Sequence, residues 1–175
     1  RLLRLNERIT GTRLLRSVVV VGGTRKDLGG AEKGLLLKEI REIKDDFEKT
    51  IQILWQVDSL VDRIEGTGII KKEIAEALGA VGPIARASGI DRDLRRDHPY
   101  AAYQELLFMS PVFTEGDVES RMRVKIQEIY ESFKLIYEAL EAMPQGPLCA
   151  EPKPLPSSSG ALGYVESPRG ECFHW

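Results

Sequence analysis

An arginine between a proline and a glycine is the residue of this chain best suited to chemistry. Arg169 follows Pro168 and precedes Gly170. The proline fixes its own φ and favours an extended Ser167, while the glycine lets the backbone turn sharply. A guanidinium on such stiff backbone can hold an electrostatic position without reordering during a reaction. An ordinary hairpin turn with a surface arginine remains the alternative, because these residue types are common in turns.

Residues 82–100 hold a second group of reactive side chains, a loop rich in glycine, proline and charge. A long irregular segment inside a compact domain is usually functional or disordered. The small residues between Ala85 and Gly89 favour close backbone packing over disorder. Its charged members could also form a buried ion-pair network that pins the loop. These charged residues are Arg86, Asp91, Arg92, Asp93, Arg95, Arg96 and Asp97.

The two histidines are weaker candidates. His98 could act as a general base if it faced a substrate and had an orienting partner, or it could be an ordinary hydrogen-bonding loop residue. Strand alternation would place His174 on the same face as Cys172. Together these two could donate to one metal, but two ligands do not make a metal site.

Composition excludes several classes of function. With 25 basic and 27 acidic side chains interleaved, the chain shows no nucleic-acid footprint. Cys149 and Cys172 are far apart and lack C-x-x-C spacing, which favours a reducing compartment over a disulfide framework. No apolar run approaches the roughly 20 residues that span a bilayer, and we see no signal peptide. Both ends look cut, which suggests a piece of a longer protein.

The apolar spacing predicts mostly helices to position these groups. Asp117 is the expected N-cap of the last long helix, which the Pro144–Pro147 stretch should end. Residues 106–113 suit a short strand or an extended run. We expect helices over 2–16, 30–65, 70–78 and 121–143, a buried strand at 18–21, and strands at 161–165 and 171–175.

Three motifs resemble one known family. Residues 82–103, which read GPIARASGIDRDLRRDHPYAAY, resemble the central segment of the large subunit shared by respiratory complex I (49 kDa subunit) and the membrane-bound, energy-converting nickel–iron hydrogenases of the formate hydrogenlyase type. Gly116-Asp117 with Arg121, and the helix ending in residues 143–147, are similar to the same subunit. Residues 166–171 look like its Glu-Ala-Pro-Arg-Gly or Glu-Ala-Pro-Lys-Gly element.

The resemblance implies a mainly α fold, an antiparallel helical bundle of the hydrogenase large subunit type with small β pieces. Residues 1–175 would be a single domain, the central part of a longer subunit. Electron transfer would be coupled to hydrogen or quinone chemistry in a multi-subunit oxidoreductase. The subunit would be peripheral, on the cytoplasmic side of a membrane, with an iron–sulfur small subunit and other subunits as partners. The isolated fragment would be inactive and would self-associate, with a dimer expected.

The resemblance also implies roles for individual residues. In such hydrogenases the arginine of this element lies over the nickel–iron centre, which makes Arg169 a neighbouring cation supported by Glu166. The loop residues Arg86, Asp93, Arg95, His98 and Tyr100 would line the substrate cavity or hold the loop. In complex I the same cavity serves a quinone, and the element often carries lysine. Arg169 and the His174-Trp175 ending therefore favour the hydrogenase branch.

One departure from the family limits this interpretation. Hydrogenase large subunits bind nickel through two C-x-x-C pairs, one near each end, and this sequence has neither. They would lie before Arg1 and after Trp175, or the chain is a divergent relative that never had them. We therefore expect no cofactor in this chain, and a nickel–iron centre in the full-length protein only if the hydrogenase branch is right. A metal-free quinone-cavity subunit and a non-catalytic helical scaffold are the alternatives.

Overall fold

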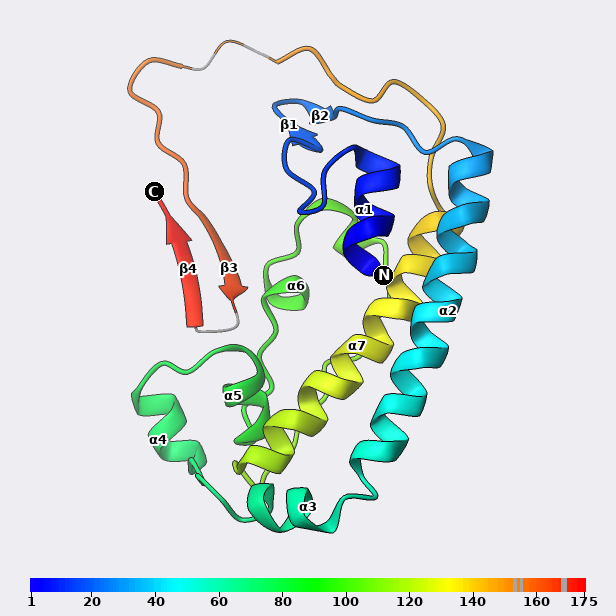
Figure 1. The fold of residues 1–175 in the computed structure, drawn as a ribbon. Helices are drawn as coiled ribbons and strands as arrows, with labels where there is room; N and C mark the ends of the chain where they lie inside the picture. Colours follow the sequence, from blue (N-terminus) through cyan, green and yellow to red (C-terminus); the bar gives the residue numbers. More distant parts are fainter. Residues whose placement is uncertain (153, 155, 168–169) are drawn as a thin grey trace. The chain divides into compact units, whose positions relative to one another are not determined.

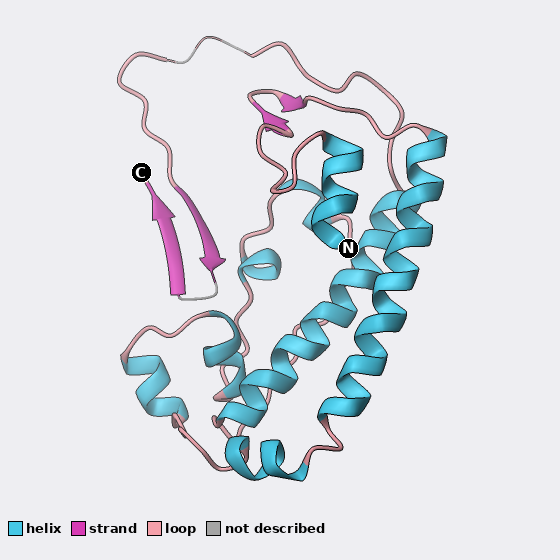
Figure 2. Ribbon diagram, in the orientation of Figure 1, coloured by secondary structure: helices cyan, strands magenta, loops and turns pink. Residues whose placement is uncertain are grey.

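The computed structural model describes residues 1–152, 154, 156–167 and 170–175. Helices dominate it, accompanied by two small antiparallel sheets (Figure 2). This confirms the mainly α prediction. The chain divides into two compact units, one of residues 1–52 and 140–159, the other of residues 53–139 and 160–175. The single-domain expectation stays a prediction.

The first unit begins with α1, Leu2–Thr10, which is shorter than the helix expected over 2–16. Gly11 ends it, because its φ of 81° is left-handed, and its N–H caps the helix by donating to the carbonyl of Glu7. The prediction that the helix continues to residue 16 was therefore wrong. Thr10 reinforces the break, since its hydroxyl can donate to the carbonyl of Asn6 at 2.8 Å or to that of Thr12 at 3.0 Å.

A minimal hairpin follows in the same unit. Its strands are β1, Val19–Val20, and β2, Gly23–Thr24, and Gly23 also bridges to Cys149. The strand expected at 18–21 exists, but its predicted burial was wrong, because Val19 is 79% and Val21 83% exposed. Two residues per strand are too few to define an inward face, so the β-branched run predicted the strand and not its burial.

The helix expected over residues 30–65 is two helices. The first, α2, spans Gly30–Leu54, and α3 spans Asp58–Ile64 in the second unit. The chain tightens between them, where the Gln56 and Val57 amides donate three residues back. Val57 then takes an extended conformation before α3 starts.

The second unit carries every side chain discussed below as a candidate site. The β3–β4 hairpin pairs Gly163 with His174 and Ser167 with Gly170, which confirms the two predicted strands. The Pro168-Arg169 step lies outside the described residues. The remaining elements of the unit (Figure 1) are α4 (Lys72–Ala77), α5 (Gly82–Ala87), α6 (Leu94–Asp97), the 3-10 helix η1 (Ala101–Gln104), α7 (Val118–Glu141), β3 (Gly163–Ser167) and β4 (Gly170–His174).

A buried carboxylate starts α7. Asp117 accepts the Ser120 amide at 2.7 Å and, with its other oxygen, the Gly66 amide at 2.8 Å, which confirms the predicted N-cap. Gly116 precedes it with φ 68°, and a Cβ there would collide with the carbonyl oxygen of Ile70. The start of α7 is therefore hydrogen-bonded to residues 66–70. No helix among the described residues is both long and apolar enough to span a bilayer.

Candidate functional site

The loop expected over residues 82–100 is partly helical, with α5 and α6 inside it. Pro83 occupies the first turn of α5, where a missing N–H costs nothing. Ala85 and Ala87 are fully buried, and these small side chains let α5 pack closely enough to bury Arg86, which is 2% exposed. The prediction of close packing is thus confirmed, and that of an irregular loop corrected. The helical propensity of this short stretch was hidden by its glycines.

Arg86 is the centre of the site. Its Nε donates to Glu128 Oε1 of α7 at 2.9 Å, and Nη2 donates to the same oxygen. Nη1 donates to Glu166 Oε2 of β3 at 2.9 Å and to the Arg92 carbonyl at 2.7 Å. A buried guanidinium is stable only when its charge and N–H groups are paired in this way. We call Arg86, Asp93, Arg95, Glu128 and Glu166 the Arg86 network.

Asp93 is the second buried charge of the network. It is the N-cap of α6 and accepts the Nε of Arg95 at 2.9 Å and its Nη2 at 2.7 Å, with Arg86 Nη1 3.7 Å away. The Ser110 hydroxyl donates to it at 3.0 Å. Burial by itself would raise the pKa of Asp93, but the Arg95 hydrogen bonds and the charges of Arg95 and Arg86 outweigh burial, and the pKa lies below its ordinary value. Asp93 therefore stays ionised.

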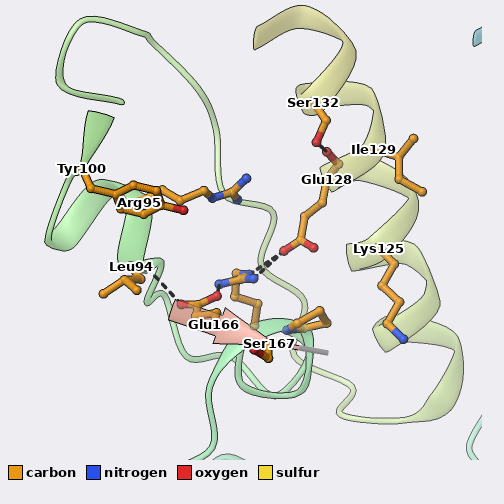
Figure 3. A pocket seen from close by; sticks show the side chains of 11 residues that line it. Leu94, Arg95, Tyr100, Lys125, Glu128, Ile129, Ser132, Glu166 and Ser167 are labelled. Carbon is orange, nitrogen blue, oxygen red and sulfur yellow. Dashed lines mark hydrogen bonds and ion pairs between the residues drawn. The ribbon is translucent and has the colours of Figure 1, made fainter. Parts of the chain in front are cut away.

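Glu166 connects the hairpin to the loop with both carboxylate oxygens. Its Oε2 accepts from Arg86, and its Oε1 accepts the Leu94 amide at 3.0 Å. The end of β3 is thereby fixed to α5 and to the start of α6. Figure 3 shows the side chain of Glu128 projecting from α7, and Glu166 on β3.

A cavity of about 490 Å³ is lined in part by this network. Four network members line it, together with Tyr100 and the exposed Lys125. Burial raises the pKa of Tyr100, and neighbouring Tyr103 raises it further, so the phenol stays protonated at neutral pH. The residues lining the cavity (Figure 3) are Pro83, Arg86, Leu94, Arg95, Tyr100, Lys125, Glu128, Ile129, Ser132, Glu166 and Ser167.

His98 borders the Arg86 network, since it lines a cavity of about 350 Å³ together with Glu166. Its ring meets Tyr164 of β3 edge to face, with centroids 5.7 Å apart. It lines a neighbouring cavity of about 430 Å³ together with Cys172 and His174. On β4, Cys172 Sγ lies 3.4 Å from His174 Nε2, so strand alternation placed the two on one face as predicted. No group of three or more potential ligands that could hold a metal occurs among the described residues.

The structure thus brings together five of the seven predicted site residues: Arg86, Asp93, Arg95 and Glu166 in one network, with Tyr100 on the cavity wall. His98 is a neighbour, and Arg169 lies outside the described residues. Sequence reasoning missed Glu128 and Ser110. Glu128 lies 42 positions from Arg86 on a helix full of surface acids, and no local spacing distinguishes it. Its only sequence signal is its position beside the apolar stripe residue Ile129.

Comparison with known proteins decides the family. The family model described as respiratory-chain NADH dehydrogenase, 49 Kd subunit, matches residues 1–163. The chain belongs to this family. The assignment confirms the family resemblance, with the motifs at residues 82–103 and 116–147 inside the matched range, and it makes the chain a member of an oxidoreductase family.

Relatives in this family include both hydrogenase and NADH-quinone oxidoreductase subunits. The chain is 34% identical to hydrogenase-4 component G of Escherichia coli K12, over 97% of this chain and 28% of the relative. It is also 34% identical to an NADH-quinone oxidoreductase subunit of Chloroherpeton thalassium, over 95% of this chain and 41% of that one. The chain thus spans less than half the length of either curated relative. The names alone do not separate the hydrogenase branch from the quinone branch.

A solved structure shares the fold. It is that of an archaeal respiratory membrane complex, the membrane-bound sulfane sulfur reductase. The TM-score is 0.86 at 28% identity, and the match covers 98% of this chain and 48% of that one. A related fold therefore occurs in an archaeal respiratory membrane complex.

Proposed function

We propose that this chain is the cavity-forming central part of the large subunit of a membrane-bound oxidoreductase, with an antiparallel bundle of the hydrogenase large subunit type. One observation carries the proposal. Two sequence motifs that resembled the family, residues 82–103 and 166–171, meet at the contact between Arg86 and Glu166, 80 positions apart in the chain. A motif pair that only stabilised separate elements would not need a shared buried contact.

In this proposal Arg169 supplies a fixed positive charge beside a redox or quinone centre, and Glu166 supports the turn that carries it. Two-electron reduction of a bound acceptor develops negative charge, which a preorganised cation stabilises more than water does. The Arg86 network contributes rigidity, since both oxygens of Glu166 are already engaged. Arg86, Asp93, Arg95 and Tyr100 would hold and line the cavity, and His98 would border it.

The described residues do not fit a nickel–iron centre. The sequence has no C-x-x-C pair, and its two cysteines, Cys149 and Cys172, fall in different units. No cluster of three potential ligands occurs in the part of the chain that the structure covers. If the full-length protein binds nickel and iron, the ligands must come from other residues, and we derive no step through such a centre.

A quinone-cavity subunit is the second candidate. It is favoured because the matching family model is that of the NADH dehydrogenase subunit, over residues 1–163. A two-electron reduction of a quinone takes up two protons and forms a quinol. In either version, the partners would be an iron–sulfur small subunit and other subunits at the cytoplasmic face of a membrane. Self-association would be confined to the isolated fragment, and a monomeric mass by light scattering would contradict it.

The test uses the full-length protein in its complete complex. Arg169→Ala, Arg169→Lys and the control Arg63→Ala, which changes an exposed arginine of α3, are assayed with hydrogen and methyl viologen, and with a short-chain quinone. Loss of a preorganised charge should lower kcat by about 100-fold in the Ala variant, with partial activity for Lys. The productive assay identifies the branch. Normal assembly with unchanged turnover in both Arg169 variants would support the scaffold alternative and overturn the proposal.

A further inference from the structure

Glu128 has the geometry of a residue that acts through another residue. It projects from the middle of α7, a helix of 24 residues, and its side chain is 20% exposed. Its Oε1 accepts both the Nε and the Nη2 hydrogen bonds of Arg86. A guanidinium held along one edge by a single oxygen has its plane and its distance from α7 fixed.

Arg86 has no freedom to compensate for a change at Glu128. Its side chain is 3% exposed, and its Nη1 is already committed to the Arg92 carbonyl and to Glu166. Nη1 also lies 3.7 Å from Asp93 Oδ2. Any movement of the guanidinium toward solvent would break these contacts in a buried setting, where unpaired charge is unfavourable.

Glu166 transmits the position of Arg86 to the hairpin. Its two oxygens engage Arg86 and the Leu94 amide, so the end of β3 is held from two sides. Only Ser167 separates Glu166 from the Pro168-Arg169 step of the sequence. A chain of three charged side chains therefore leads from α7, through α5, to the hairpin end.

We propose that Glu128 is a positioning residue, which sets the end of β3, at Ser167, relative to α7 through Arg86 and Glu166. The inference rests on the proposed function of Arg169. Glu128 itself need not touch the substrate. A displacement of about 1 Å in a positioned group can lower a rate by about 100-fold, so a change at Glu128 should be visible in turnover.

The experiment is a double-mutant cycle on the full-length protein in its complex. Glu128→Gln removes the charge and keeps the size, and Glu128→Asp keeps the charge and shortens the reach. Glu138→Gln is the matched control on the same helix, because Glu138 pairs with the exposed Lys134, 3.9 Å away. Each is measured for kcat and KM in the wild-type and Arg169→Ala backgrounds, with the assay that proves productive, after complex assembly is confirmed by native mass.

In the wild-type background, Glu128→Gln should lower kcat by about tenfold or more with KM changed by less than about threefold, because a displaced cation affects the reaction more than binding. The kcat of Glu128→Asp should lie between those of wild type and Glu128→Gln. The kcat of Glu138→Gln should match that of wild type. In the Arg169→Ala background, Glu128→Gln should cause no further loss, since the two residues act as one unit.

The outcomes separate the two proposals. If Arg169→Ala is slow but Glu128→Gln is silent, or lowers kcat equally in both backgrounds, only the Glu128 inference fails. If Arg169→Ala keeps wild-type turnover, the proposed function fails and takes the inference with it. If Glu128→Gln prevents assembly, Glu128→Asp decides by the same two-background comparison.

Discussion

Two sets of ion pairs involve residues 82–100. Their contact distances are similar, but they differ in burial and in the sequence separation of their partners. The Arg86 network is buried, with Arg86 3% and Asp93 1% exposed, and it reaches α7 and β3. The surface pairs formed by Arg96 with Asp91 and Asp97 leave Arg96 41% and Asp91 62% exposed, and they link only near neighbours. Yet the Arg96–Asp91 and Arg86–Glu166 contacts measure 2.8 and 2.9 Å. Contact distance therefore does not tell which pairs hold the fold, whereas burial and sequence separation do.

The largest expected loss of stability comes from removing Arg86, the central cation of the buried network. Arg86→Ala leaves Asp93 and Glu166 without their shared cation inside the protein, which should destabilise the fold by about 3–5 kcal/mol. Urea unfolding of the full-length protein, followed by circular dichroism, measures the loss. Arg63→Ala serves as the exposed control. A loss below about 1 kcal/mol would mean that the network is solvated in solution, as exposed pairs are.

Asp93→Asn tests the same set through pH. The pKa of Asp93 lies below its ordinary value of 3.8. The ionised carboxylate therefore stabilises the folded state fully above pH 3.8, and this stabilisation is lost as the pH falls through the lowered pKa. At pH 7 the Asn variant should be less stable by about 1–3 kcal/mol, since it loses charged hydrogen bonds.

The readout is the difference in melting temperature between wild type and Asp93→Asn at pH 7 and at pH 3. We expect this difference to narrow at pH 3, because the stabilisation that comes from the lowered pKa of Asp93 declines as pH falls below 3.8. A gap that is constant or wider at pH 3 would contradict the pKa direction.

A buried carboxylate that accepts backbone amides sharpens the comparison. Burial would raise the pKa of Asp117, but the amides of Ser120 and Gly66, together with the Ser120 side chain, lower it. Asp117→Ala should cost about 1–2 kcal/mol, the range of a lost N-cap, which is less than the Arg86 variant. Hydrogen exchange of peptides covering residues 64–70 should speed up, and Asp62→Ala on α3 should leave it unchanged. Unaltered exchange in the Asp117 variant would refute the cap's role.

The smallest effect belongs to the surface set. Arg96→Ala should change the free energy of unfolding by less than about 1 kcal/mol, because an exposed pair gains little in water. Raising the salt concentration to about 1 M should remove most of that difference, since the Debye length falls to about 3 Å. A larger, salt-independent loss would show that the two sets do not differ as described.

Local signals in the sequence predicted much of the fold. The N-cap at Asp117, the end of α7 before the Pro144–Pro147 stretch and the strands of the β3–β4 hairpin all depend on neighbouring residues, and all three are confirmed. The predictions failed where one local sequence pattern is compatible with two structures. The exposed Val19 run and the break between α2 and α3 belong to this class.

The candidate site was predictable only in part for the same reason. The acids and arginines of residues 86–97 indicated that some would be buried, and Arg86 with Asp93 are. Which of the seven charges would be buried was not encoded locally. It depends on Glu128 and Glu166, which are 42 and 80 positions from Arg86. Contacts at such separations require the fold itself, and the roles assigned to the site residues remain predictions.

The most direct test of the comparison is a pair of double-mutant cycles on the stability of the full-length protein. One cycle combines Arg86→Met with Glu166→Gln, and the other combines Arg96→Met with Asp91→Asn. A buried charged hydrogen bond should give a coupling free energy of about 1.5–3 kcal/mol, and the surface pair less than about 0.5 kcal/mol. Equal coupling energies in the two cycles would contradict the claim that burial makes the Arg86 network the contact that holds the hairpin in place.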